Sequence, residues 1–349
     1  MTQNPTPPQT EKTTEKAPGK EDLKSEQPAN ASRAEWPGIA ECTSTLGIRI
    51  LLLLTRIGGD WILRPALLPV LAVYWLTNPR LRAAVSAYQI RADRKSGLFA
   101  ALGVKGPGFW TGLMQLERFA LAIREKFSAL AGVNPAGLVV ENDGMFRADP
   151  PAQGAVILTS HTGCQELLMT TAGGFTEHEI VILQHTAHAR KFNELLGRAG
   201  AKPAKALFFE IGEALSPALV MELSEHASRG AYIILAGDRV PMGSDAAAPC
   251  PFLGDPARFP TGGALIALLL GIPLRMMVCT RPTVSKREFH VRFDSLCEAP
   301  PRARRGAREK WLAEMAALYA ANLERALTRT PLSPLDWANF FDFWEEQKK

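Results

Sequence analysis

The chain has 349 residues, 46% of them hydrophobic, which is enough for one large domain or two small ones. Its five cysteines are scattered and include no C-x-x-C pair, so the sequence argues against a disulfide framework or a zinc site and favours a reducing, cytoplasmic setting. The net charge of +5 suits an anionic lipid surface or an acidic partner as well as a nucleic acid.

Residues 1–33 have the composition of a disordered tail. They are rich in Thr, Gln, Pro, Glu and Lys and contain no aromatic residue. Such a segment buries too little apolar surface to offset the entropy that it loses on ordering. The N-terminus also lacks the basic-then-apolar pattern of a cleaved signal peptide.

Residues 34–100 are expected to form a membrane-associating helical segment. The stretch Gly47–Leu76 is strongly apolar and long enough to cross a bilayer or to lie along it. Charged residues interrupt it, however, and Pro65 and Pro69 break helical structure. We therefore expect an amphipathic or re-entrant pair of helices, with a single tilted span or a buried core helix as alternatives. Aromatic residues would hold the helices in the interface, and the basic residues that follow would face anionic headgroups: Trp61, Tyr74 and Trp75, then Arg80, Arg82, Arg91, Arg94 and Lys95.

Residues 101–330 alternate short apolar strands with helices, as is typical of an α/β domain. Within them, Leu138–Arg147 predicts a strand hairpin that turns at Asn142-Asp143-Gly144. We predict an α/β fold with a mostly parallel central sheet flanked by helices, and with Glu288–Leu296 as an edge strand. The aromatic tail, residues 331–349, should pack on this domain at its membrane-proximal face. The other expected strands are Ala155–Thr159, Ile180–Gln184, Ala206–Phe209, Ala231–Ala236 and Leu274–Cys279, and the expected helices are Gly112–Ala131, Glu166–Ala172, Arg190–Arg198, Ile211–Ser228, Thr261–Leu270 and Arg308–Thr328.

The most informative stretch is Ala155–Met169, AVILTSHTGCQELLM. Its first five residues predict a buried strand, and Thr162 followed by Gln165 has the spacing of a capping box at a helix start. His161 and Glu166 then occupy the two positions whose side chains normally meet across the first turn. The spacing therefore predicts a contacting His–Glu pair at a helix N-terminus. A capped helix with an exposed pair is the alternative interpretation.

A His–Glu pair of this kind supports general-base chemistry. A carboxylate bound to one imidazole nitrogen fixes the tautomer and stabilises the imidazolium, which leaves the other nitrogen available to accept a proton. The N–H groups at the helix start would stabilise an oxyanion. No serine or cysteine is clearly placed as a nucleophile, so the base would act on a hydroxyl that the substrate supplies.

Several other polar residues have both a functional and a structural interpretation. His185 and His188 follow a predicted strand, but no third ligand accompanies them at a suitable spacing, so lining a pocket is favoured over binding a metal. Cys164 lies at a helix N-terminus, which lowers a thiol pKa, and both an acyl-cysteine step and a small packing residue stay open. Asp238 follows an apolar strand, where ligand residues of α/β sheets gather, or it forms a turn. Arg198 taken alone fits a solvated charge at a helix end.

In their order along the chain, these features resemble the late acyltransferases of lipid A biosynthesis, members of the wider lysophospholipid acyltransferase superfamily. The resemblance covers Trp36–Leu327. It rests on the membrane-associating N-terminal segment, the strand–SHTGCQE–helix unit, the segment Asn193–Gly200, and the block Gly237–Pro273, in which GDRVPMGS is similar to the family's D-Q/R loop. The joint order of the four features makes the resemblance specific.

The resemblance implies a membrane-associated O-acyltransferase at the cytoplasmic face of a bacterial inner membrane. Such an enzyme moves a fatty acyl chain from an acyl carrier protein or coenzyme A thioester to a hydroxyl of a glycolipid or another lipid, and it needs no metal or cofactor. His161 matches the family's base and Glu166 its acidic partner. Arg198 sits where the family carries an arginine for the acyl-donor or headgroup side, and Asp238 and Arg239 match the D-Q/R corner beneath the active site.

The chain also departs from this family. Thr-Gly-Cys-Gln separates His161 from Glu166 where Gly-Asn-Trp is usual, and GDR replaces DQ, which favours a divergent member acting on another hydroxylated or amino lipid. A catalytically silent lipid-binding or assembly protein of the same fold is the alternative. A hydrolase that uses the same pair on water is a third option, although the absence of a G-x-S-x-G motif argues against the serine type. A nucleic-acid partner is not expected, because the basic run Arg302–Lys310 has no interleaved aromatic residues.

Overall fold

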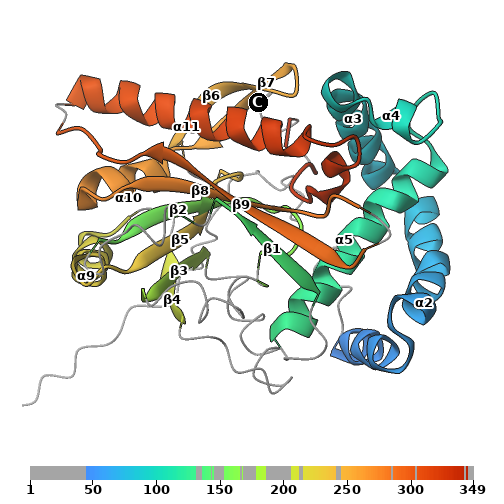
Figure 1. Ribbon diagram of the computed structural model, residues 1–349. Coiled ribbons are helices and arrows are strands. Elements are labelled where there is room, and N and C mark those ends of the chain that lie inside the picture. The colour runs from blue at the N-terminus through green and yellow to red at the C-terminus, as the bar shows by residue number, and fades with distance from the viewer. Residues whose placement is uncertain are drawn as a thin grey trace, which may run out of the picture. The chain divides into compact units, whose positions relative to one another are not determined.

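A seven-stranded mixed sheet lies at the centre of the described part of the chain (Figure 1). Its strand order is β1-β9-β8-β2-β5-β3-β4. β8 and β9 are antiparallel, and the other neighbouring pairs are parallel. The predicted α/β class and the mostly parallel sheet are thereby confirmed. The strands are β1 (Gly137–Glu141), β2 (Ala155–Thr159), β3 (Ile180–His185), β4 (Ala206–Ile211), β5 (Tyr232–Ala236), β8 (Leu274–Thr280) and β9 (Glu288–Cys297).

The computed structural model describes residues 45–130, 136–142, 144, 153–165, 167, 178–185, 206–211, 215–240, 245–283, 286–302, 305–341 and 343–344. All of them belong to the second of the two units into which the chain divides, Ser44–Lys349. The predicted disordered tail lies outside the described residues, as do the predicted helix 190–198 and most of the predicted helix 166–172.

The central strands are buried along nearly their whole length, because both faces of the sheet are covered. Every residue of β2 is buried, and so are all but the last residue of β8. Alternating patterns belong to strands with one solvated face, whereas a strand between two helical layers reads as a continuous apolar run. This is why the run Ala155–Thr159 predicted β2 with both of its ends.

The prediction of Glu288–Leu296 as an edge strand is wrong, since β9 lies between β1 and β8. The strict alternation of this segment indicates which of its side chains face inward. It does not indicate whether the strand has one neighbour or two in the sheet. The first arm of the hairpin predicted for Leu138–Arg147 corresponds to β1, which pairs in parallel with residues 288–292. The second arm, from Met145 onward, lies outside the described residues.

Helices cover both faces of the sheet. α10 packs on β2 and α11 packs on β8 and β9, above the sheet in the view of Figure 1. α3 begins at Pro79 after Asn78, whose side chain accepts the Leu81 N–H, and it ends at Gly97 with a φ of 68°. The described helices are α2 (Thr45–Thr77), α3 (Pro79–Ser96), α4 (Leu98–Ala101), α5 (Phe109–Leu130), α9 (Pro217–Ser228), α10 (Gly262–Leu270) and α11 (Arg305–Leu327), and a separate hairpin joins β6 (Ala247–Phe252) to β7 (Asp255–Pro260).

The N-terminal apolar stretch forms one continuous helix, α2, instead of the predicted pair, although two prolines lie inside it. Tertiary contacts with α5 support it. Arg64 Nε lies 2.6 Å from Glu117 Oε1, and the ring of Trp75 closes on Gly112, where a Cβ would lie 2.2 Å from the ring. No helix in the described part of the chain is long and apolar enough to cross a membrane.

Most of the basic residues expected to face headgroups bind protein groups. Arg82 donates from Nη1 to the carbonyls of the last turn of α2, which have no partner within the helix. Other cations of α3 hold the β6–β7 hairpin and α11. Their ion pairs are Arg91–Asp255, Arg94–Asp255 and Lys95–Glu324.

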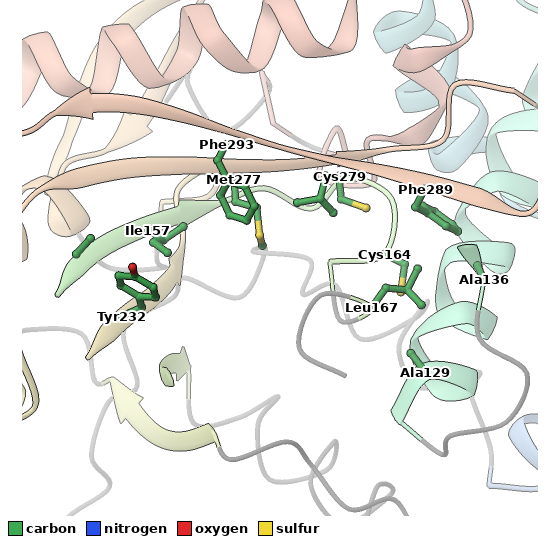
Figure 2. Close-up of a cluster of buried hydrophobic side chains, with 12 residues drawn as sticks. Ala129, Ala136, Ile157, Cys164, Leu167, Tyr232, Met277, Cys279, Phe289 and Phe293 are labelled. Carbon is green, nitrogen blue, oxygen red and sulfur yellow. The ribbon is translucent and has the colours of Figure 1, made fainter. Parts of the chain in front are cut away.

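A hydrophobic cluster lies on the face of the sheet opposite α10 and α11 (Figure 2). Ile157, Tyr232, Met277 and Phe293 from four adjacent strands contribute to it. α5 reaches the cluster through Ala129. The cluster therefore fixes α5, and with it α2, against the sheet.

The C-terminal segment packs against α3 and the β6–β7 hairpin through its aromatic side chains. A short 3₁₀ helix, η2 (Ser333–Asp336), precedes Trp337, which is fully buried. The Trp337 ring lies 5.3 Å, between centroids, from both Tyr88 and Phe252. Phe340, Phe343 and Trp344 complete this aromatic cluster.

Candidate active site

The candidate site lies at the carboxyl ends of two adjacent parallel strands. In the register of β2 with β5, Thr159 is paired with Ala236. His161 and Asp238 each follow their strand by two residues. The parallel arrangement therefore brings both side chains to the same edge of the sheet, where ligand-binding residues of α/β folds gather.

His161 and Asp238 form a hydrogen-bonded pair with unequal exposure. His161 Nδ1 lies 2.7 Å from Asp238 Oδ1, and the His161 backbone N–H donates to Asp238 Oδ2 at 2.8 Å. The Asp238 side chain is 0% exposed, whereas 48% of the His161 side chain is exposed. Because Nδ1 is engaged with Asp238, Nε2 is the ring nitrogen that remains to exchange a proton with a substrate.

The two groups change each other's pKa. The charge of Asp238 and its hydrogen bond to the imidazole raise the pKa of His161, and together they outweigh the opposing effects of burial and of the Lys126 and Arg239 charges. Burial acts to raise the pKa of Asp238, but the His161 charge and the hydrogen bonds from His161 and Trp337 outweigh it, so that pKa lies below its ordinary value. The pair is a buried carboxylate beside an imidazole that readily accepts a proton.

A segment from the far end of the chain completes the surroundings of Asp238. Trp337 Nε1 donates to Asp238 Oδ2 at 2.9 Å, and Asn339 Nδ2 donates to the Asp238 carbonyl at 2.6 Å. The Ala338 N–H donates to the His161 carbonyl at 2.8 Å. The carboxylate thus accepts N–H groups from His161 and Trp337, which offset the cost of burying its charge.

The loop after β2 depends on a glycine with positive φ. Gly163 has a φ of 51°, and a Cβ there would lie 2.6 Å from the Cys279 carbonyl oxygen. Its N–H donates to the Asp336 carbonyl at 3.0 Å. Thr162 Oγ1, which was expected to cap a helix, accepts the Cys279 N–H at 3.2 Å and lies 2.8 Å from Ser160 Oγ. The loop is therefore anchored to β8 and to the C-terminal segment.

The other predicted site residues fall in different places. Glu166 and Arg198 lie outside the described residues, so the predicted His–Glu contact stays a prediction. His185 is the last residue of β3, and its side chain is likewise outside the described set. Cys164 is fully buried in the hydrophobic cluster (Figure 2), which fits the alternative of a packing residue and keeps its thiol away from a substrate. Arg239 donates from Nη1 to Oδ1 of Asn339, in the C-terminal segment, at 3.1 Å.

Among the described residues, the site presents a ring nitrogen that can accept a proton, and neither Ser160 nor Cys164 is exposed as a nucleophile. Ser160 is 1% exposed, and its hydroxyl is paired with Thr162, so it is not presented to a substrate. Within the described residues there is no group of three or more His, Cys, Asp or Glu side chains that could hold a metal ion. What the arrangement can do is accept a proton at His161 Nε2 and stabilise the resulting imidazolium.

Three features of the site were not predicted from the sequence: Asp238 as the partner of His161, and the contacts of Trp337 and Asn339. The pairing of Asp238 with His161 could have been suspected from the sequence. In Thr-Ser-His (159–161) and in Ala-Gly-Asp (236–238), a polar residue stands two positions after the end of an apolar strand. No local pattern reveals a contact between residues 99 positions apart, as Trp337 and Asp238 are. Comparison of the chain with protein-family models and with curated proteins gave no match.

Proposed function

We propose that this protein is a membrane-associated acyltransferase that moves a fatty acyl chain from an acyl carrier protein or coenzyme A thioester to a hydroxyl of a glycolipid or another lipid. The observation that carries the proposal is the buried Asp238 carboxylate against Nδ1 of the half-exposed His161. A base held in this way activates a hydroxyl without a covalent enzyme intermediate. The acyl-transfer class comes from the resemblance to the lipid A late acyltransferases, and the departures from their motifs favour a divergent member.

In the proposed reaction, His161 Nε2 takes the proton of the acceptor hydroxyl while that oxygen attacks the thioester carbonyl. The tetrahedral intermediate then collapses, the C–S bond breaks, and the imidazolium returns the proton to the departing thiolate. Asp238 favours the tautomer with the proton on Nδ1 and stabilises the imidazolium. The Lys126 and Arg239 charges act on His161 and would favour an oxyanion or a phosphate-bearing substrate there. Glu166 and Arg198 stay predicted contributors to the same step.

Exposed apolar side chains support a lipid surface as the setting of this reaction. Soluble monomers rarely expose large contiguous apolar patches. On α2 and at the start of α5, five large apolar side chains are each at least 61% exposed. Tryptophan in particular is enriched at the boundary between lipid and water. We propose that Trp61, Val70, Val73, Leu76 and Trp110 contact a lipid surface. The cytoplasmic face of a bacterial inner membrane as that surface comes from the resemblance alone.

The test is acyl transfer by the full chain in lipid vesicles, with acyl carrier protein and coenzyme A thioesters as donors and hydroxylated lipids as acceptors. The His161→Gln variant keeps an N–H donor for Asp238 but lacks a base. We expect its transfer rate to fall by at least about a hundredfold, since general-base catalysis contributes roughly 10²–10⁴-fold.

His226→Gln is the matched control. His226 Nδ1 also contacts a carboxylate, that of Glu179 at 2.7 Å, but it lies before the amino end of β5, at the opposite edge of the sheet. Near-normal transfer by His161→Gln would contradict the mechanism. Release of free fatty acid in place of an acylated lipid would favour the hydrolase, and lipid binding without turnover of any donor would favour the silent alternative.

A further inference from the structure

Residues Pro334–Asn339, within the C-terminal segment, contact both the helical layer and the two loops that carry His161 and Asp238. We call these two residues the dyad. Donors from α3 and α5 bind the backbone carbonyls of Pro334–Asn339 and the Asp336 side chain. The same segment donates to the His161 carbonyl and to both the side chain and the carbonyl of Asp238. The contacts with the helices are Tyr88 Oη to the Pro334 carbonyl at 2.6 Å, Gln115 Nε2 to the carbonyls of Leu335 at 3.1 Å and Trp337 at 3.2 Å, and Arg118 Nη1 to Asp336 Oδ1 at 3.0 Å.

The indole of Trp337 constrains the rotation of the Asp238 carboxylate. The terminal torsion of an aspartate is broad, so the carboxylate plane is not fixed by the side chain itself. Here Oδ2 accepts N–H groups from both His161 and Trp337, which leaves Oδ1 directed at His161 Nδ1. Because the Trp337 ring is 0% exposed and packed among aromatic neighbours, its N–H has a fixed direction.

Asn339 constrains the backbone of Asp238, the residue that carries this carboxylate. Its Nδ2 donates to the Asp238 carbonyl at 2.6 Å, and its Oδ1 accepts from Arg239 Nη1 at 3.1 Å. One side chain thus spans two consecutive residues of the loop after β5. Asn339 is itself 3% exposed, so water does not compete strongly for these contacts.

We propose that Trp337 and Asn339 are positioning residues, which hold the Asp238 carboxylate so that His161 is oriented as a base. They act through Asp238 and do not touch the reacting atoms. The activity part of this inference rests on the proposed function, whereas the orientation of the dyad is measurable without any substrate.

The first experiment compares Trp337→Phe with Trp344→Phe in the full chain. Both variants lose an indole from the same aromatic cluster, but Trp344 Nε1 is buried with no hydrogen-bond partner among the described residues. Only Trp337→Phe therefore removes a contact with Asp238. We expect it to lower kcat by about ten- to a hundredfold with KM changed less than about twofold, as for a misoriented catalytic group. Trp344→Phe should keep kcat within about threefold of wild type.

The second readout is the pKa of His161 measured by NMR on the protein without substrate. A carboxylate that is free to rotate contacts Nδ1 less of the time, so Trp337→Phe should lower this pKa and weaken the deshielded Nδ1 proton signal. Trp344→Phe should change neither. Asn339→Ala should shift both in the same direction as Trp337→Phe.

The outcomes separate this inference from the proposed function. A His161 pKa in Trp337→Phe that equals that of Trp344→Phe, or that rises, would overturn the positioning role, whatever the enzyme does. If no variant and not even the wild type transfers an acyl group, the proposed function fails, while a lowered His161 pKa in Trp337→Phe alone still supports the positioning role.

Discussion

Thr159 of β2 and Ala236 of β5 are direct partners in the parallel sheet, and their register sets the distance between the two groups of the dyad. A slip of one residue would displace His161 from Asp238 by about 3.3 Å. That displacement exceeds the whole 2.7 Å contact between Nδ1 and Oδ1. The pairing of His161 with Asp238 is therefore a consequence of sheet register, which brings the two loops together at the same end of the sheet.

Asp238→Asn keeps the shape of the side chain but removes the charge that raises the pKa of His161. The opposing effects of burial and of Lys126 and Arg239 then dominate, so the pKa of His161 should fall below its wild-type value. A base must be neutral to act, so the acid limb of kcat against pH should move to lower pH. We also expect kcat to fall by on the order of 10³–10⁴-fold, because the imidazole loses its tautomer control. NMR titration of His161 and kcat–pH profiles check both effects.

Asp255→Asn provides the control for this change. Burial acts to raise the pKa of Asp255, but hydrogen bonds and charges from Arg91 and Arg94 outweigh it, so this pKa is also lowered. Asp255 lies on the β6–β7 hairpin and contacts α3 instead of His161. Its substitution should leave the acid limb in place. A His161 pKa in Asp238→Asn at or above the wild-type value would contradict the account of the pair.

Much of the fold follows from local pattern because each central strand carries its own signal. β2 was predicted with both ends correct. The strand–loop unit alone also led to the hypothesis that His161 acts as a base. The partner of His161 was not predicted, because a contact across 77 residues depends on strand order, which periodicity does not encode. The same limit explains β9: alternation identifies its inward face, but its neighbours follow from the pairing of the whole sheet.

Gly163→Ala should destabilise the loop that carries His161. Its φ of 51° disfavours any residue with a Cβ, and that atom would lie 2.6 Å from the Cys279 carbonyl oxygen. Together these effects should cost roughly 2–4 kcal/mol of unfolding free energy. Gly262→Ala is the control, since a Cβ there meets nothing within 4 Å. Chemical denaturation of the two variants measures the difference, and equal stabilities would show that the loop relaxes without strain.

Gly112→Ala tests the docking of α2 on α5. Alanine favours an exposed helix over glycine by about 1 kcal/mol. Here, however, the new methyl would lie 2.2 Å from the Trp75 ring. Because Trp75 is only 5% exposed, the ring has little room to move, and we expect a net loss of roughly 1–3 kcal/mol. A second substitution, Trp75→Leu, should recover part of this loss, and a stabilised Gly112→Ala protein would show that α2 does not dock as described.

Asp336 should make the protein less stable as pH rises from about 4 to about 6. Burial raises the pKa of this carboxyl to about 6, against the opposing effects of Arg118 and Arg281. Its folded pKa thus exceeds its unfolded pKa, so the native state binds more protons between the two values. The contribution of Asp336 to the unfolding free energy then falls with rising pH across this window, by on the order of 3 kcal/mol for a pKa difference of about two units. Above the window this contribution no longer changes with pH.

Asp336→Asn should remove this slope, and urea unfolding at intervals from pH 4 to pH 7 measures it. Asp238, whose pKa is lowered, contributes in the opposite sense, because its stabilisation is lost only as pH falls below about 4. The raised pKa of His161 acts above about pH 6.5, where stability is lost as pH rises through the folded pKa. Glu141, whose pKa is lowered by Arg329 and His290, also acts in the opposite sense as pH falls through about 4.5, so the effect of Asp336 is the difference in slope between wild type and Asp336→Asn. An unchanged slope in Asp336→Asn would assign the effect to another group.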